Sequence, residues 1–248
     1  MNPTAPKERF LIISTARSGS NQLVDYVNQT RVALCFGELF KKPFFDTIDN
    51  NKQLKLITDC FSGLDEAKSI QLPDPARFWD AVASRVPGSH RYVGAKLFYE
   101  HREADPLWLQ VFKRNPIIIH LWRSHVLESF LSLDRARATK QWTVRSGSAS
   151  AQRNPLIVFD EKRYLAYRER SRTRFNRIRN RKSEAAHYYE IEYSQVSDPA
   201  RIGPTLNDIF KTQATYSATL VKQAPKDPLD NVQNRPAAEK YLDDRLDL

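Results

Sequence analysis

The sequence is poor in features that several protein classes require. Its two cysteines, Cys35 and Cys60, form no CxxC or Cys/His ligand spacing, which excludes the usual structural zinc sites. The apolar runs Phe10–Ile13 and Pro116–Trp122 are too short for a membrane-spanning helix of ~20 residues, and the first is too short for the core of a signal peptide. We therefore expect a cytoplasmic protein and no metal.

Glycine is also scarce, with seven residues, and both common nucleotide-binding glycine motifs are missing. The GxxxxGK[ST] loop of nucleotide triphosphatases is absent because no Lys–Ser/Thr pair follows Gly19. The GxGxxG fingerprint of dinucleotide-binding folds is absent as well. The sequence therefore lacks the lysine and the magnesium-holding hydroxyl of a Walker-type site.

Positive charge is in excess. The chain has 39 Lys and Arg against 29 Asp and Glu, a formal net charge of +10, and ten of the basic residues fall within positions 162–182. Such a charge attracts nucleic acid, anionic membranes or small polyanions, and charge alone does not choose among them.

Apolar runs of strand length alternate with helical patterns along the chain. The predicted strands are Phe10–Ile13, Val32–Phe36, Tyr92–Tyr99, Pro116–Trp122 and Tyr188–Tyr193. The predicted helices after the opening one are Arg77–Val86, Pro106–Arg114, Ser124–Trp142, Asp160–Glu184 and Ile202–Lys211. This alternation predicts an α/β fold, with a parallel sheet flanked by helices on both faces, in a single domain over residues 1–248.

The polar turn Thr15–Ser20 lies between the first predicted strand and a helix that places Leu23, Tyr26 and Val27 on one face. The first N–H groups of a helix lack internal partners, and its dipole favours an anion there. Ser18–Ser20 would add hydroxyls and a close backbone approach, and Arg17 would add a positive fork that suits phosphate. A serine-rich cap beside a surface arginine would have the same sequence, so the turn alone identifies no ligand.

A second candidate site begins at Arg123, which ends the strongest predicted strand. Ligands of open α/β sheets bind at the carboxyl ends of strands. Ser132 follows nine residues later, roughly 13 Å along the next helix. The two residues can hold one phosphate only if the arginine reaches along that helix; otherwise they are a capping arginine and an incidental serine.

Together these residues resemble the PAPS-dependent sulfotransferases (PAPS is 3′-phosphoadenosine-5′-phosphosulfate), most closely the bacterial Stf-zero trehalose-sulfotransferase and nodulation-factor type. FLIISTARSGSNQLVDYV is similar to that family's 5′-phosphosulfate loop, and HLWRSHVLESFLSLDRARATKQW to its 3′-phosphate segment. Phe36–Phe40 is similar to its acidic motif, and Gly94–Leu97 to its GxK strand. Asn21 replaces the usual threonine, and segment 46–90 matches no part of the family. We expect acceptor choice to reside there and near 143–160.

The resemblance implies a P-loop-like sulfotransferase fold and in-line transfer of a sulfuryl group from PAPS to a hydroxyl of a carbohydrate or glycolipid, without a metal. Glu38 is implied as the general base, Lys96 as a group that assists at the bridging oxygen, and Arg17 as a contact of the leaving phosphate. His101 is a rival base, because imidazole titrates near neutrality. The residues implied around the donor are Arg17, Ser18, Gly19, Ser20, Asn21, Gln22, Arg123, Ser132 and, stacked on adenine or simply half-buried in a strand, Tyr193. We expect His120 and His125 to orient side chains nearby.

Three other functions are open on the sequence: a P-loop-like nucleotide kinase, a catalytically silent relative, and a nucleic-acid-binding protein that uses the basic helix 162–182. The missing Walker lysine argues against the kinase. The helix has an apolar stripe and no aromatic residues interleaved on its basic face, which argues against specific nucleic-acid binding. The charge is compatible with peripheral membrane contact, and the resemblance implies a homodimer.

Overall fold

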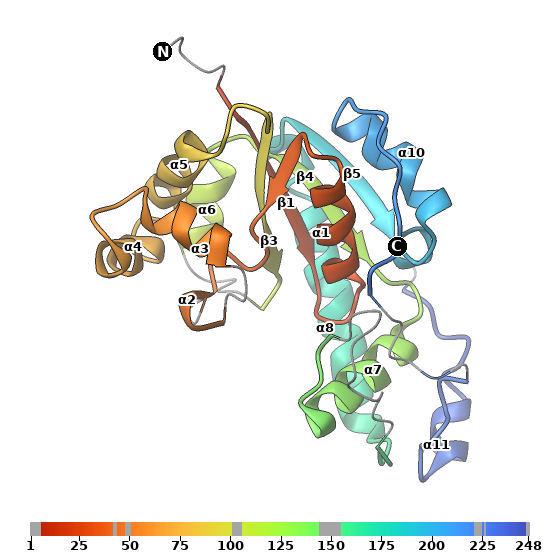
Figure 1. The fold of residues 1–248 in the computed structure, drawn as a ribbon. Coiled ribbons are helices and arrows are strands. Elements are labelled where there is room, and N and C mark those ends of the chain that lie inside the picture. The colour runs from red at the N-terminus through yellow and green to blue at the C-terminus, as the bar shows by residue number, and fades with distance from the viewer. Residues whose placement is uncertain are drawn as a thin grey trace.

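The computed structural model describes residues 6–41, 44–47, 51–100, 106–143, 155–220, 225 and 227–246. Within them, five strands form one parallel sheet in the order β2-β3-β1-β4-β5 (Figure 1). The strands are β1 (Glu8–Ser14), β2 (Ala33–Cys35), β3 (Tyr92–Phe98), β4 (Ile117–Trp122) and β5 (His187–Glu192). Each overlaps a predicted strand, and the predicted parallel sheet is confirmed.

Helices cover both faces of this sheet, which is why its central strands are apolar on both sides (Figure 1). In β1, Leu11 and Ile13 join one core cluster, and Phe10 and Ile12 join the other. The first cluster is covered by α2 (Phe44–Thr47), α3 (Asn51–Thr58), α4 (Leu64–Gln71), α5 (Pro75–Arg85) and α6 (Pro106–Phe112). The second is covered by α1 (Ser20–Gln29), α9 (Tyr193–Val196) and α10 (Pro199–Ile209). The expected helices on both faces are therefore confirmed.

Gly94 of β3 is required by packing within this sheet. The strand register pairs Gly94 with Phe10, and a Cβ at position 94 would lie 2.5 Å from the Phe10 ring. That ring is held edge-on against Phe210, with 5.1 Å between centroids. The glycine of the GxK segment is therefore explained by the core alone.

A third apolar cluster lies beyond the carboxyl edge of the sheet. It joins α7 (Val126–Thr139), the first half of α8 (Glu161–Arg179) and α11 (Arg235–Glu239); Figure 1 shows α7 and α11 below the strands. The buried guanidinium of Arg135 donates to the carbonyls of Pro228 at 2.6 Å and Asp230 at 2.9 Å. These contacts attach the segment around Pro228 and Asp230 to α7.

Three predicted boundaries differ from the structure. Helix α7 ends at Thr139, before Lys140 with its φ of 57°, and so does not reach Trp142. Tyr193 begins α9 and does not lie in β5, because Glu192 caps that helix in a reciprocal capping box. A short turn of 3₁₀ helix, Lys182–Glu184, follows α8, which ends five residues earlier than predicted.

Both cysteines are free thiols. Burial raises the pKa of Cys35 to about 12 and that of Cys60 to about 11, so neither is a ready nucleophile at neutral pH. In the described part of the chain, no three His, Cys, Asp or Glu side chains gather in a way that could hold a metal ion. None of the described helices combines the length and apolarity needed to cross a bilayer.

Candidate active site at the carboxyl edge of the sheet

The carboxyl ends of the strands meet at one edge, because the sheet is parallel. The chain goes from central β1 to β2 and β3 on one side, then crosses to β4 and β5 on the other. Ligands of open α/β sheets bind where the direction of winding reverses in this way. Here that place is the β1/β4 junction, which we define as the loop Thr15–Gly19 after β1 together with Arg123 and Ser124 after β4.

The loop after β1 has an unusual backbone. Arg17 and Gly19 adopt left-handed conformations, with φ of 67° and 83°, and the Ser18 hydroxyl closes the turn on the Thr15 carbonyl at 2.8 Å. Gly19 precedes α1 and has no side chain to cap it, so the first N–H groups of α1 face the loop. A Cβ on Gly19 would lie 2.8 Å from the Tyr193 ring. Glycine is therefore needed for both its φ and its size.

Two arginine side chains come together at the junction. Arg123 is 6% exposed; its guanidinium lies over the Tyr193 ring, 4.2 Å from the centroid, and donates to the Arg17 carbonyl at 3.4 Å. Burial, and then the positive charge of Arg123, lower the pKa of Arg17. Nε of Arg123 and the hydroxyl of Ser14 are among several buried side-chain atoms of the described residues that have no hydrogen-bond partner. Neighbouring cations and unsatisfied buried donors are the chemistry of an anion site.

The pair Arg123 and Ser132 is arranged differently from the expectation. Ser132 accepts from Nε of Arg17 at 3.0 Å, whereas Arg123 forms an ion pair with Glu128 in the first turn of α7. Arg17 also donates to the carbonyl of Trp142. Arg17 therefore links the other residues, since its side chain reaches Ser132 and its carbonyl accepts from Arg123. Sequence reasoning missed Glu128; an acid five residues after the arginine was the available indication.

A second polar cluster lies at the first turn of α1. Lys96 is only 2% exposed; its Nζ is 3.2 Å from Oε1 of Glu38 and donates to Oδ1 of Asn21. Burial lowers the pKa of Lys96, and the Glu38 carboxylate opposes that effect. Lys41, which sequence reasoning also missed, lies 3.3 Å from the other oxygen of Glu38. Asn21, where the resembling family has threonine, thus provides the acceptor that ties Lys96 to α1.

The chain after β2 delivers Glu38 to this cluster by continuing to pair with β3. Phe36 donates its N–H to the Gly94 carbonyl at 3.0 Å, and Lys96 donates its N–H to the Gly37 carbonyl at 2.6 Å. Gly37 has a φ of 68°, which turns the chain at that point. The Glu38 side chain remains 24% exposed, so solvent still reaches the carboxylate.

The other residues that the sequence analysis placed around the nucleotide make different contacts. Ser20 is buried, and Gln22 accepts from the N–H of Leu220 at 3.2 Å, which ties α1 to the segment after α10. Tyr193 supports Arg123 and packs on Gly19; whether it also stacks on adenine stays a prediction.

Three histidines are named in the sequence analysis, and the structure describes two of them. His101 lies outside the described residues. His120 is fully buried, hydrogen-bonds the hydroxyls of Tyr99 and Tyr188, and has its pKa lowered to about 3, first by burial. Its contacts are with these tyrosines and not with Arg123, so it has a structural environment. His125 is half-exposed and lies 3.6 Å from Glu128, the partner of Arg123.

The chain matches no known protein-family model, and no curated protein is significantly similar to it. The geometry therefore has to indicate the chemistry. Arg17 and Arg123 place two guanidinium groups at the junction, and Glu38 and Lys96 place a carboxylate beside a buried ammonium group at the same edge of the sheet.

Proposed function

We propose that the chain is a PAPS-dependent sulfotransferase with a P-loop-like fold, which transfers a sulfuryl group to a hydroxyl of a carbohydrate or glycolipid. One observation carries the proposal. The buried ammonium of Lys96 binds both Asn21, in the first turn of α1, and the carboxylate of Glu38. A proton acceptor is thereby held beside the loop that has the backbone of a phosphate site.

The two arginines support a donor with two separate phosphate groups. The N–H groups at the start of α1 suit the 5′-phosphosulfate, as does Arg17. The 3′-phosphate is assigned to Arg123 and Ser132, which Arg17 brings to the same junction. Charge-assisted contacts from guanidinium groups suit a dianionic phosphate. The unsatisfied Nε of Arg123 is consistent with this assignment.

The proposed step is an in-line displacement at sulfur. The acceptor oxygen bonds to sulfur while the bond from sulfur to the bridging oxygen of the 5′-phosphate breaks. Glu38 takes the proton of the acceptor hydroxyl, and Lys96 and Arg17 stabilise the charge that develops on the leaving phosphate. The products are a sulfate ester, protonated Glu38 and 3′,5′-ADP.

Transfer of radiolabelled sulfur from PAPS to a mixture of carbohydrates and glycolipids tests the proposal. The wild type should form labelled ester. Glu38→Gln, which is nearly isosteric but accepts no proton, should be ~10²-fold slower or worse with unchanged 3′,5′-ADP affinity. Glu8→Gln, at the opposite end of β1, is the matched control and should retain activity.

Two outcomes would contradict parts of the proposal. Normal turnover by Glu38→Gln together with an inactive His101→Ala would give the role of base to His101. A wild type that neither binds 3′,5′-ADP nor forms labelled ester would exclude the sulfotransferase itself.

A further inference from the structure

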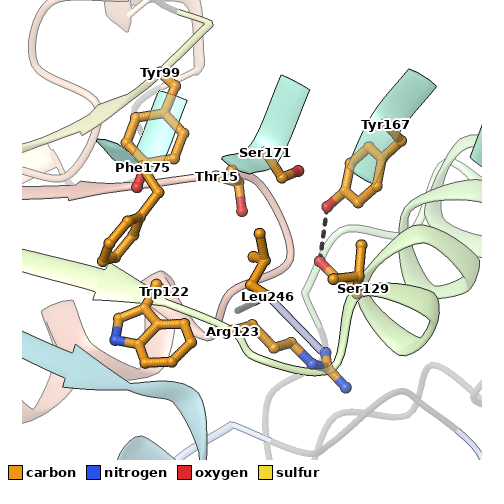
Figure 2. A pocket seen from close by; sticks show the side chains of 10 residues that line it. Thr15, Tyr99, Trp122, Arg123, Ser129, Tyr167, Ser171, Phe175 and Leu246 are labelled. Carbon is orange, nitrogen blue, oxygen red and sulfur yellow. Dashed lines mark hydrogen bonds between the residues drawn. The ribbon is translucent and has the colours of Figure 1, made fainter. Parts of the chain in front are cut away.

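A pocket next to the β1/β4 junction is occupied by the chain's own C-terminal segment. Only about 20 Å³ of it is free, room for about one water molecule, and Figure 2 shows the side chain of Leu246 among the residues that line it. One wall is aromatic, formed by Tyr99, Trp122 and Phe175, and the opposite side carries hydroxyls from α7 and α8. Leucine is thus the occupant of a site whose lining suits hydrocarbon.

The segment that ends in Leu246 is attached to the loop after β4. Leu246 donates its N–H to the Ser124 carbonyl at 3.0 Å, and Arg245 forms an isolated antiparallel bridge with His125. Asp244, just before them, lies 3.2 Å from Arg168 of α8. The Leu246 side chain itself is only partly buried. Leu246 packs against the third apolar cluster, so its withdrawal uncovers an apolar site that a ligand can fill.

The pocket shares two residues with the β1/β4 junction. Thr15 begins the loop after β1 and Arg123 follows β4, and both line the pocket (Figure 2). The hydroxyls of Ser129 and Tyr167 hydrogen-bond each other at 2.8 Å, which leaves that side weakly polar rather than charged. A ligand in the pocket would thus place an apolar group among the aromatic residues and its other end at the junction.

We propose that this pocket receives an apolar group of the acceptor, an aromatic ring or branched hydrocarbon, and that Leu246 must leave before the acceptor binds. The inference rests on the proposed sulfotransferase function, because it makes the acceptor an amphipathic alcohol. Its apolar part lies toward Trp122 and Phe175, and its hydroxyl lies toward Thr15, which begins the loop proposed to hold the sulfuryl donor. Occupancy by Leu246 lowers the apparent affinity in proportion to the fraction of molecules whose pocket is closed.

Calorimetric titration with 2-naphthol, an aromatic alcohol, tests the inference on the full chain saturated with 3′,5′-ADP. Leu246→Ala should bind 2-naphthol about tenfold more tightly than the wild type, since the competing leucine is gone. Leu242→Ala is the matched control: it removes an exposed leucine of the same segment that does not line the pocket, and should change nothing.

A filling substitution provides the opposite test. Ser171 lines the pocket from α8, and Ser171→Phe in the Leu246→Ala background should abolish 2-naphthol binding while 3′,5′-ADP still binds. Val126→Trp fills the pocket from α7 and replaces this variant if Ser171→Phe does not fold.

The outcomes separate the two proposals. If 3′,5′-ADP binds but Leu246→Ala gains no affinity for 2-naphthol, or the filled variants still bind it, the pocket is not the acceptor site and the sulfotransferase proposal stands. Competition between 2-naphthol and 3′,5′-ADP would assign the pocket to the nucleotide and overturn the inference. Failure of the wild type to bind 3′,5′-ADP would remove the proposed function and the acceptor role together.

Discussion

The burial of the Lys96 ammonium group is not explained by the stability of the fold. Its side chain is 3% exposed, and burial disfavours its charged form, as the lowered pKa indicates. A buried ion pair is often no more stable than an apolar residue of similar volume. An ammonium group kept in such a place beside Glu38 and Asn21 is better explained by a role in binding or catalysis.

This interpretation predicts that Lys96→Met folds with an equal or higher melting temperature, yet forms 3′,5′-ADP from PAPS ~10²-fold more slowly or worse, because the leaving phosphate loses its cation. Thermal unfolding and a turnover assay give the two readouts. Lys55→Met, on the exposed surface of α3, is the control for loss of one positive charge. An unfolded Lys96→Met would instead make the residue structural.

The buried His120 is expected to make the stability of the fold depend on pH. Its folded pKa of about 3 lies below the ordinary value of 6.5, because burial disfavours the imidazolium ion. The unfolded chain therefore binds the extra proton first as the pH falls, and stability is lost from about pH 6.5 downward. One pKa unit corresponds to 1.36 kcal/mol, so the loss between about pH 6.5 and pH 5 is about 2 kcal/mol.

Urea denaturation at pH 7.5 and pH 5.0 measures this effect. The wild type should lose about 2 kcal/mol more than His120→Gln over that interval, since glutamine does not titrate while the other groups are common to both proteins. Equal losses in the two proteins would show that His120 is protonated in the folded state.

At the scale of elements, the strands and the loop after β1 could be predicted because their information is local. Apolar runs with β-branched residues marked β1 and β4, and small polar residues marked the turn at Ser18–Ser20. The helices between 46 and 74 escaped prediction: α3 and α4 have eight residues each, and long-range packing in the first core cluster covers them. Short helices carry weak periodic patterns.

The structure brings several of the predicted residues together at one edge of the sheet, but their contacts differ from those predicted. Ser132 accepts a hydrogen bond from Arg17, 115 positions away in sequence. Arg123, its predicted partner, forms an ion pair with Glu128 instead. Tyr193 begins a helix instead of ending a strand, because Glu192 forms a capping box with Gln195, three residues later. These partners depend on which side chains lie close together after folding. The spacing of residues along the chain does not predict them.

The packing of α1 against α9 gives a prediction at this scale. Gly19→Ala would push a methyl group into the Tyr193 ring, which supports Arg123, and would keep a strained φ. We expect 3′,5′-ADP affinity to fall about tenfold or more, the equivalent of about 1.4 kcal/mol. Gly63→Ala is a matched control, because Gly63 also has a positive φ but meets no atom within 4 Å. Unchanged affinity in Gly19→Ala would remove Tyr193 from the site.

The net charge of +10 is a property of the whole molecule, and many of the positive charges are paired with acids. Much of the positive charge along and just after α8 is matched by acids. The pairs are Arg163–Asp134, Arg168–Asp244, Arg172–Glu169, Arg174–Glu100, Arg179–Glu190 and Arg181–Glu184. An arginine surface paired in this way is a poor phosphate-tracking face, which supports a small anionic ligand over nucleic acid.

The β1/β4 junction is proposed to hold a nucleotide by both its 5′- and its 3′-phosphate. Thermal or urea unfolding with 3′,5′-ADP, 5′-AMP and ATP with Mg²⁺ tests it most directly. At ~100 dissociation constants, 3′,5′-ADP should stabilise the fold by about 2.7 kcal/mol. The same concentration of 5′-AMP should do far less, because it leaves Arg123 and Ser132 without their phosphate. Equal stabilisation by 3′,5′-ADP and 5′-AMP, or a clear preference for ATP with Mg²⁺, would contradict the account.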